Sequence, residues 1–500
     1  FGVAESYFFR EEYDAAIEAY TRYLKNYASS PNFSLAKIRL GQSYFLNGKY
    51  KEAISALQSV TRDGLKSDQT QIVDYYLGRA FFETKNLSEA VKFLQEAANN
   101  ESDVRTVSQS NLLLGDIALE QKEYKLAKNF YQVVIEKSTD PQIQSLGLFK
   151  KGEAEFINGN LDAAVPIYEQ CIKQYSKLPI AKDAWVNLVT TLYNQGKYDV
   201  VIKKLETEKS FSKNFNITYL AINTYLKQDK QDEAIKVLNE GLEASFSGEE
   251  KEKLIIKKAE ILIKMQQFEE ALTFLDAQMS AIPNMKEQAS YLKAEGLFGL
   301  NKLDKAVQTY DQIVKDYPDS QIADDALWSQ AVTLNKSNQI ETAAQAFETY
   351  FSQGSDQSRR SQALYNAIIL HIKIKNAERA IASSLQYQET FPEGEYRKKV
   401  QYLLPNLYQR KGDIQKAVVA IQEYIAQYPG DRDSEMHFLL GYNSMLAEQP
   451  DQALKAYQFN IDKGPEDEFA YLALKNSASV HISLGQESEA IQLFEKILQD

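Results

Sequence analysis

The chain has 500 residues, and 57 Lys and Arg against 69 Asp and Glu give a net charge of −12 at pH 7. An apolar fraction of 44% suits a chain with a buried core, and the acidic balance argues against a broad nucleic-acid surface, which needs clustered Lys and Arg. The longest apolar runs, such as residues 418–421, are too short to span a membrane. Cys171 is the single cysteine, which excludes an internal disulfide framework and a cysteine-rich zinc site.

The first residues lead us to expect that the sequence is a segment of a longer protein. Residues 1–4 include no starting Met and no signal-peptide pattern, and they fall inside a predicted helix. The lack of a signal peptide in such a segment says nothing about export.

A short motif recurs along the whole chain: an aromatic residue or Leu, two residues, Ala, three residues, and a bulky apolar residue. Its first copies are Tyr13-x-x-Ala16-x-x-x-Tyr20 and Tyr50-x-x-Ala53-x-x-x-Leu57. We call the central residue of each copy the anchor and count positions from it. The anchors are Ala16, Ala53, Ala90, Ala127, Ala164, Val201, Ala234, Ala271, Ala306, Ala343, Ala380, Ala417, Ala453 and Ala490. Successive anchors are mostly 37 residues apart, a period typical of solenoids, in which each repeat buries its apolar face against its neighbours.

Each repeat is predicted to consist of two helices. The anchor and positions −3 and +4 share one face of the second helix. Position −12, on the first helix, is small in most repeats: Gly41, Gly78, Gly115, Gly152, Gly441, Ala259, Ala294, Ala331 and Ala478. Gly inside a helix costs about 0.5–1 kcal/mol relative to Ala, so a packing contact must offset the loss. We expect this small residue to contact the small anchor of the second helix.

The turns and stops of the repeats are also marked. Glycines between the two helices are expected in the left-handed conformation that ends a helix: Gly48, Gly159, Gly196 and Gly412. Prolines are expected to end second helices: Pro141, Pro318, Pro392 and Pro429. Pro405 occupies position −12 of its repeat and is expected to kink that first helix.

These residues resemble the tetratricopeptide repeat (TPR): Leu-Gly on the first helix, Ala-x-x-x-aromatic on the second, and a trailing Pro. The resemblance covers essentially the whole chain and implies an all-α fold, a right-handed α-solenoid of about fourteen repeats. Residues 1–206 would form repeats 1–6, the first truncated at its start, and residues 207–500 repeats 7–14, in one continuous solenoid. The anchor spacing falls to 33 beside the polar stretch 204–216, where we expect a hinge or a change of pitch.

Motifs that carry catalysis are absent from the sequence. It contains no phosphate-binding glycine loop, no H-E-x-x-H and no G-x-S-x-G. His371 and His481 occupy position −9, where other repeats carry apolar or aromatic residues, and His437 lies apart from both. We interpret the first two as packing histidines and Cys171 as a buried structural thiol. The predictions are therefore no enzyme activity, no cofactor and no metal.

The candidate site is a surface. In the TPR family the inner groove is lined by first-helix positions that include −15 and −8. The predicted partner-binding residues at these positions are Tyr75, Phe82, Phe149, Phe156, Tyr193, Tyr291, Phe298, Trp328, Tyr365, Tyr402 and Phe438. Polar residues at position −11 lie between them: Gln42, Arg79, Asp116, Glu153, Thr190, Asn223, Glu260 and Glu295. Such aromatic rows suit an extended peptide or an inserted helix. Burial of these rings against neighbouring helices is the alternative.

Two specialised TPR sites do not fit. The chaperone carboxylate clamp needs Lys and Asn where this chain carries Ile38, Tyr75 or Phe149. The asparagine ladder of TPR glycosyltransferases would need more than the isolated Asn187 and Asn366. Residues 306–320, followed by Ala323, Ala326 and Trp328, are instead similar to the repeats of bacterial cell-envelope TPR proteins.

We therefore expect a non-catalytic scaffold that binds a protein or peptide partner, in the bacterial periplasm or at the periplasmic face of the outer membrane, with the cytoplasm as the alternative. A rival hypothesis is a substrate-recruiting or regulatory arm of a larger enzyme or secretion machine whose catalytic part lies outside this segment. Self-association through uncapped terminal repeats is a third. No nucleic-acid partner and no membrane span are expected.

Overall fold

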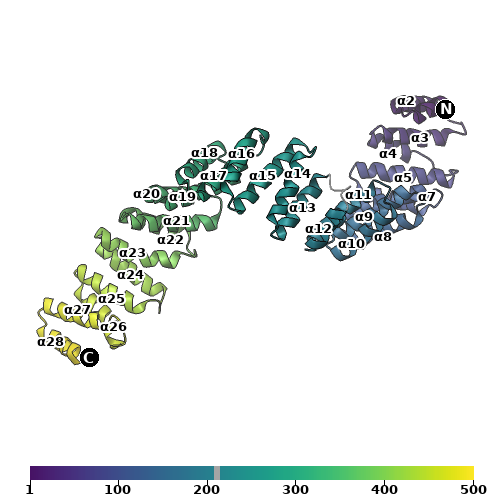
Figure 1. Ribbon diagram of the computed structural model, residues 1–500. Helices are drawn as coiled ribbons and strands as arrows, with labels where there is room; N and C mark the ends of the chain where they lie inside the picture. The colour runs from purple at the N-terminus through teal and green to yellow at the C-terminus, as the bar shows by residue number, and fades with distance from the viewer. Residues whose placement is uncertain (208–213, 500) are drawn as a thin grey trace. The chain divides into compact units, whose positions relative to one another are not determined.

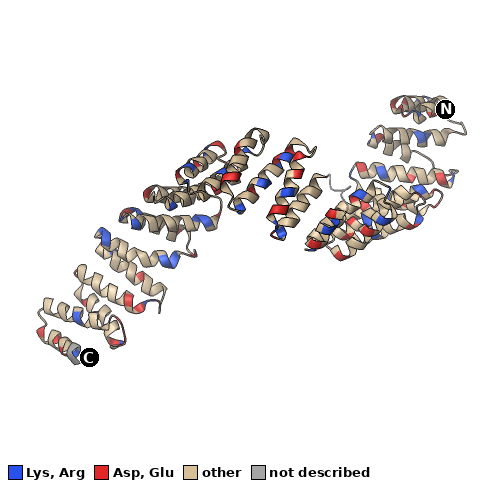
Figure 2. Cartoon of the chain, viewed as in Figure 1, with Lys and Arg blue, Asp and Glu red and all other residues tan. Residues whose placement is uncertain are grey.

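The computed structural model describes residues 1–207 and 214–499, and the regular structure in these ranges is helical (Figure 1). The chain divides into two compact parts, Phe1–Phe246 and Ser247–Asp500, called here the N-terminal and C-terminal parts. Lys, Arg, Asp and Glu are interspersed along the helices of each part (Figure 2). The net charge is nevertheless uneven, because residues 1–246 carry −2 and residues 247–500 carry −10 of the total of −12.

The N-terminal part contains helices α1 to α14. Their bounds are α1 Gly2–Phe9, α2 Tyr13–Asn26, α3 Phe33–Leu46, α4 Tyr50–Gln58, α5 Ser67–Glu83, α6 Leu87–Asn99, α7 Val104–Glu120, α8 Tyr124–Lys137, α9 Pro141–Ile157, α10 Leu161–Gln174, α11 Ile180–Asn194, α12 Tyr198–Thr207, α13 Phe215–Lys227 and α14 Gln231–Glu243.

The C-terminal part contains helices α15 to α28 and a short 3₁₀ helix, η2. Their bounds are α15 Gly248–Lys264, α16 Phe268–Gln278, η2 Met279–Ala281, α17 Lys286–Gly299, α18 Leu303–Asp316, α19 Gln321–Lys336, α20 Ile340–Gln353, α21 Gln357–Lys373, α22 Ala377–Thr390, α23 Arg397–Lys411, α24 Ile414–Gln427, α25 Asp433–Leu446, α26 Pro450–Asp462, α27 Ala470–Ser483 and α28 Glu487–Gln499.

Consecutive helices pair as predicted, so that α1 with α2 forms repeat 1 and α27 with α28 forms repeat 14 of the described chain. Each pair carries one anchor on its second helix, and every anchor is buried, with at most 2% of its surface exposed. Each second helix also contacts the first helix of the following repeat in its own part. The prediction of an all-α fold built from about fourteen helix-turn-helix repeats is confirmed.

The partner of the small residue at position −12 differs from the prediction. A Cβ added to Gly41 or Gly78 would meet the side chain of the Leu at position +4, and one added to Gly115, Gly152 or Gly441 would meet the Tyr there. A helical side chain leans toward the N-terminus and covers the turn before its own Cα. The residue at +4 therefore lies over the anchor and fills the space next to the glycine. Small residues make room for this bulky side chain rather than for each other.

The turn inside each repeat adopts one conformation throughout the described chain. The four glycines predicted to be left-handed have φ between 73° and 87°, which confirms that prediction. The same position, −5 from the anchor, is left-handed in the other repeats too, although nine of them carry a residue with a side chain, such as Lys85, Lys122 or Gln266. The turn geometry is thus set by the helix pair and not by glycine alone.

The proline predictions have mixed outcomes. Pro318, Pro392 and Pro429 follow the ends of α18, α22 and α24, as expected. Pro141 was wrongly placed: it is the first residue of α9, where its missing N–H costs nothing because a first-turn N–H has no partner in the helix. Pro405 is buried within α23, which continues to Lys411. The hinge predicted at 204–216 includes residues 208–213, which lie outside the described residues, and it stays a prediction.

Candidate partner-binding face

The first helices of neighbouring repeats contact one another directly. Within the N-terminal part α3 contacts α5, and the series continues through α7, α9, α11 and α13; within the C-terminal part α15 contacts α17, α17 contacts α19, and α25 contacts α27. Side chains at positions −15 and −8 are two helical turns apart, so they lie on one stripe of each first helix. Where first helices contact each other, this stripe continues into the next repeat.

The predicted partner-binding residues all lie on this stripe, called the ring face from here on. Every one of its eleven rings is half-buried, so each has an edge in contact with the protein and an edge in contact with solvent. Phe149, Tyr291 and Phe438 pack against the Tyr at position +4 of their own repeat, with ring centroids 5.8–6.1 Å apart. Whether these rings bind a partner stays a prediction.

Acidic residues at position −11 hold the buried tyrosines behind the ring face. The Tyr131 hydroxyl donates to Asp116 Oδ1 at 2.8 Å, and Tyr310 donates to Glu295 in the same way. Burial and the neighbouring carboxylate raise the pKa of both phenols. The polar positions between the rings therefore stabilise the repeat, in addition to any contact with a partner.

One set of residues on this face has no counterpart in the sequence analysis. We call the contact between two successive repeats a joint. In four consecutive joints of the C-terminal part, the side chain at position −21 of one repeat covers the ring at position −15 of the preceding repeat. Tyr396 stacks on Tyr365 with centroids 4.4 Å apart, and Phe469 stacks on Phe438 at 5.2 Å. The guanidinium groups of Arg432 and Arg359 lie 4.6 and 6.0 Å from the ring centroids of Tyr402 and Trp328. The recurrence of aromatic residues and Arg at −21 was the signal that could have found them.

The histidines and the cysteine have structural contacts. His371 is buried and its Nε2 lies 2.8 Å from Glu348 Oε1, while His437 stacks on Phe459 and His481 contacts Gln486. Burial raises the pKa of the Cys171 thiol to about 11, so it is protonated and unreactive at neutral pH. In residues 1–207 and 214–499 no group of three or more His, Cys, Asp or Glu is placed to hold a metal ion.

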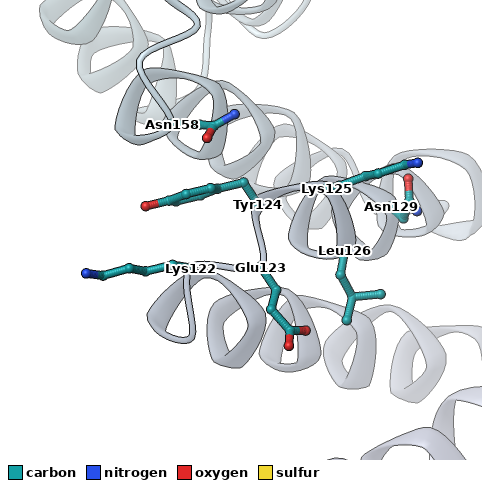
Figure 3. A pocket seen from close by; sticks show the side chains of 7 residues that line it. All are labelled: Lys122, Glu123, Tyr124, Lys125, Leu126, Asn129 and Asn158. Atoms are coloured by element: carbon teal, nitrogen blue, oxygen red, sulfur yellow. The ribbon is translucent and has the colours of Figure 1, made fainter.

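A surface depression elsewhere carries none of the ring-face residues. It lies over the turn before α8 and is lined by Lys122, Glu123, Tyr124, Lys125, Leu126, Asn129 and Asn158. Figure 3 shows that these side chains point in several directions around the turn, so they do not converge on one point. We assign no site to it.

Protein-family comparisons identify the repeats. Residues 4–67, 39–104 and 149–200 match a family model described as tetratricopeptide repeat, and residues 288–320 match a second model with this description. The chain contains tetratricopeptide repeats. Residues 357–495, in the last TPR units, match the YfiO family model, described as an outer membrane lipoprotein.

Other comparisons add less. A search of curated proteins found no match to this TPR chain. It is similar to a structure of Naa15/Naa10 bound to HypK-THB (TM-score 0.38, 17% identity, 99% of this chain and 74% of that chain) and to the APC/C hetero-tetramer Cut9-Hcn1 (0.33, 13%, 99% and 92%). It is also similar to a tetratricopeptide repeat protein from Parabacteroides merdae (0.37, 16%, 53% and 98%). No helix in the described TPR units is both long and apolar enough to cross a membrane.

Proposed function

We propose that this TPR chain is a non-catalytic scaffold that binds protein partners along its ring face. The observation that carries the proposal is the half-burial of all eleven rings at the same two positions of the first helices. A ring whose inner edge is fixed by the protein keeps little conformational freedom, so it can gain contact area with a partner at a low entropy cost. Tyr and Trp are also among the residue types that contribute most to interface affinity.

We further propose that the scaffold works in the bacterial cell envelope. The match of residues 357–495 to the outer membrane lipoprotein model supports this setting. The similarity of residues 306–328 to envelope TPR repeats points the same way. The protein partner would then be another component of an envelope assembly.

Site-specific photo-crosslinking tests the scaffold proposal. A photo-reactive phenylalanine analogue replaces Phe156 or Phe298 on the ring face, and Leu126 or Val419, which are exposed on second helices, in matched controls. We expect discrete crosslinked partner bands from the ring-face positions and none from the controls. Equal crosslinking at all four positions, or none at the ring face, would contradict the proposal, and crosslinks to a second copy would indicate self-association. Fractionation of cells that make the full protein tests the envelope setting, which recovery with the cytosol would contradict.

A further inference from the structure

One part of the ring face is hollowed into a pocket of about 330 Å³ in the C-terminal part. It lies where repeats 11, 12 and 13 meet, and α21, α23, α24 and the loop before α25 contribute to it. Its lining residues are Tyr365, Lys398, Lys399, Tyr402, Leu403, Tyr424, Asp431 and Arg432. Two of them, Tyr365 and Tyr402, are ring-face residues predicted from the sequence.

The pocket combines three cations with the rings that they cover. Arg432 lies over Tyr402, and Lys399 Nζ lies 5.3 Å from the ring centroid of Tyr396 and 6.0 Å from that of Tyr365. Lys and Arg gather at both ends of α23 (Figure 2). Lys398 and Lys399, in the cluster at its start, line the pocket. A basic pocket is notable in a chain of net charge −12, because most of its surface would repel an acidic ligand.

The three cations differ in their partners. Lys398 Nζ lies 2.8 Å from Asp431 Oδ1, and Arg432 lies 3.1 Å from Glu435 Oε2. In the part of the chain that the structure describes, no carboxylate lies within ion-pair distance of Lys399, whose side chain is exposed. Lys399 is therefore the cation that is available to a ligand.

We propose that this pocket binds an acidic, extended segment of a protein partner, with one carboxylate on Lys399 and an adjacent apolar or aromatic side chain against Tyr402 and Leu403. The proposal rests on the scaffold function proposed above and identifies the chemistry of one partner segment. The electrostatic attraction to Lys399 would select acidic sequences, and the rings would supply contact area.

A single carboxylate fits better than a phosphate group. Asp431 and Glu435 each pair with one of the other cations, so these two ion pairs are together close to neutral. The charge left for a ligand is that of Lys399, which one monoanionic carboxylate matches and a phosphate dianion exceeds. The tyrosine-lined wall also favours a peptide over a free ion.

Fluorescence anisotropy with a defined probe tests the proposal on the full chain. The probe is a fluorescein-labelled dodecapeptide that repeats Glu-Phe-Ser, and its twin carries Gln in place of Glu. We expect the Glu probe to bind more tightly than the Gln twin, and Lys399→Glu to weaken the Glu probe about tenfold, as loss of a favourable charge contact and gain of a repulsive one would do. Lys455→Glu on the exposed side of α26 makes the same charge change outside the pocket and should weaken binding less than about twofold, the effect of a distant screened charge.

The outcomes of this experiment distinguish the acidic-segment proposal from the scaffold function proposed above. Equal binding of the two probes, an equal effect of both Lys variants, or displacement of the Glu probe by inorganic phosphate would overturn the acidic-segment proposal. Crosslinks at Phe156 or Phe298 would still support the scaffold in each of these cases. Unchanged circular dichroism and thermal unfolding of Lys399→Glu would show that lost binding is not lost folding.

Discussion

Two joints between neighbouring repeats, one in each part, differ in the side chains that form them: ion pairs at the first and a stack of two rings at the second. Between repeats 4 and 5, Lys150 of α9 lies 3.4 Å from Asp116 of α7, and Lys128 of α8 lies 2.5 Å from Glu155 of α9. Between repeats 11 and 12, Tyr396 stacks on Tyr365 instead. The same helical hairpin therefore accepts two kinds of joint. Only the charged kind should depend strongly on pH and salt.

The two parts share the packing of position −12 against position +4 inside each repeat. The same substitution at position −12 should therefore lower stability equally in both parts. Gly115→Ala and Gly441→Ala would each place a Cβ within 2.4–2.5 Å of a fully buried Tyr ring, so we expect each to lower local stability by about 1–3 kcal/mol. Gly248→Ala meets no atom within 4 Å and should be neutral or slightly stabilising. Hydrogen exchange of α7, α8, α25 and α26 measures the effect. A loss in one part alone would mean that the parts differ inside their repeats as well as at their joints.

The sequence predicted the repeats because the spacing of the anchors and the period of the helices can both be read directly from residue positions along the chain. The ring face followed from the same period, since positions −15 and −8 share a helix. The sequence analysis missed the covering residues, which are Arg359, Tyr396, Arg432 and Phe469. Each of them contacts a ring of another repeat, whereas the helical period relates only residues that share one helix. The partner of Gly115 was mistaken because the lean of Tyr131 along its helix decides the contact, and spacing alone does not show it.

The pH dependence of stability tests the charged joint through two glutamates of α9, Glu153 and Glu155. Burial alone would raise the pKa of Glu155, but hydrogen bonds from Lys128 and Asn160 outweigh it and hold that pKa below its usual value. The unfolded chain then binds more protons in the acidic window between the lowered pKa and the usual pKa of a glutamate, so the stability that Glu155 supplies is lost as the pH falls through that window. Glu155→Gln should cost about 1.5–2 kcal/mol at neutral pH and almost nothing at the acid end of that window, as measured by urea unfolding.

Glu153 provides the matched control with the opposite sign. Burial raises the pKa of Glu153, and the lysine beside it only partly compensates. The folded state then binds the extra proton, so this contribution to stability falls as the pH rises through the raised pKa. Glu153→Gln should remove that slope and should lack the cost at neutral pH that is expected for Glu155→Gln. The same pH dependence for both variants would show that the ion pair with Lys128 does not control the joint.

Removing one side chain from each kind of joint shows how the stability of that joint depends on salt concentration. Tyr396→Ala removes the ring that covers Tyr365 and should lower the stability of repeats 11 and 12 by about 1–1.5 kcal/mol at any ionic strength. Lys150→Met removes the cation that contacts Asp116 and Glu153 and should cost about 0.5–1 kcal/mol at low salt. Raising the salt from about 0.05 M to about 0.5 M should reduce only the second loss, because screening acts on charges. Hydrogen exchange at the two salt concentrations would detect the reverse pattern.

Substitutions in the left-handed turn are expected to have the smallest effect on stability, with opposite signs inside the turn and inside the helix that follows. Lys122, in the turn shown in Figure 3, has φ of 62° and an exposed side chain, and Asn338 has φ of 60° in the C-terminal part. A left-handed Lys is strained by its Cβ, whereas Asn tolerates this conformation, so the strain is larger at the N-terminal position. Lys122→Gly should therefore raise local stability by about 0.5–1 kcal/mol and Asn338→Gly by less. Lys125→Gly, three residues later inside α8, should lower it by about 1 kcal/mol, because there the glycine only adds freedom to the unfolded chain. A gain from Lys125→Gly, or a loss from Lys122→Gly, would show that the side chain at the turn and not its backbone conformation decides the stability of the hairpin.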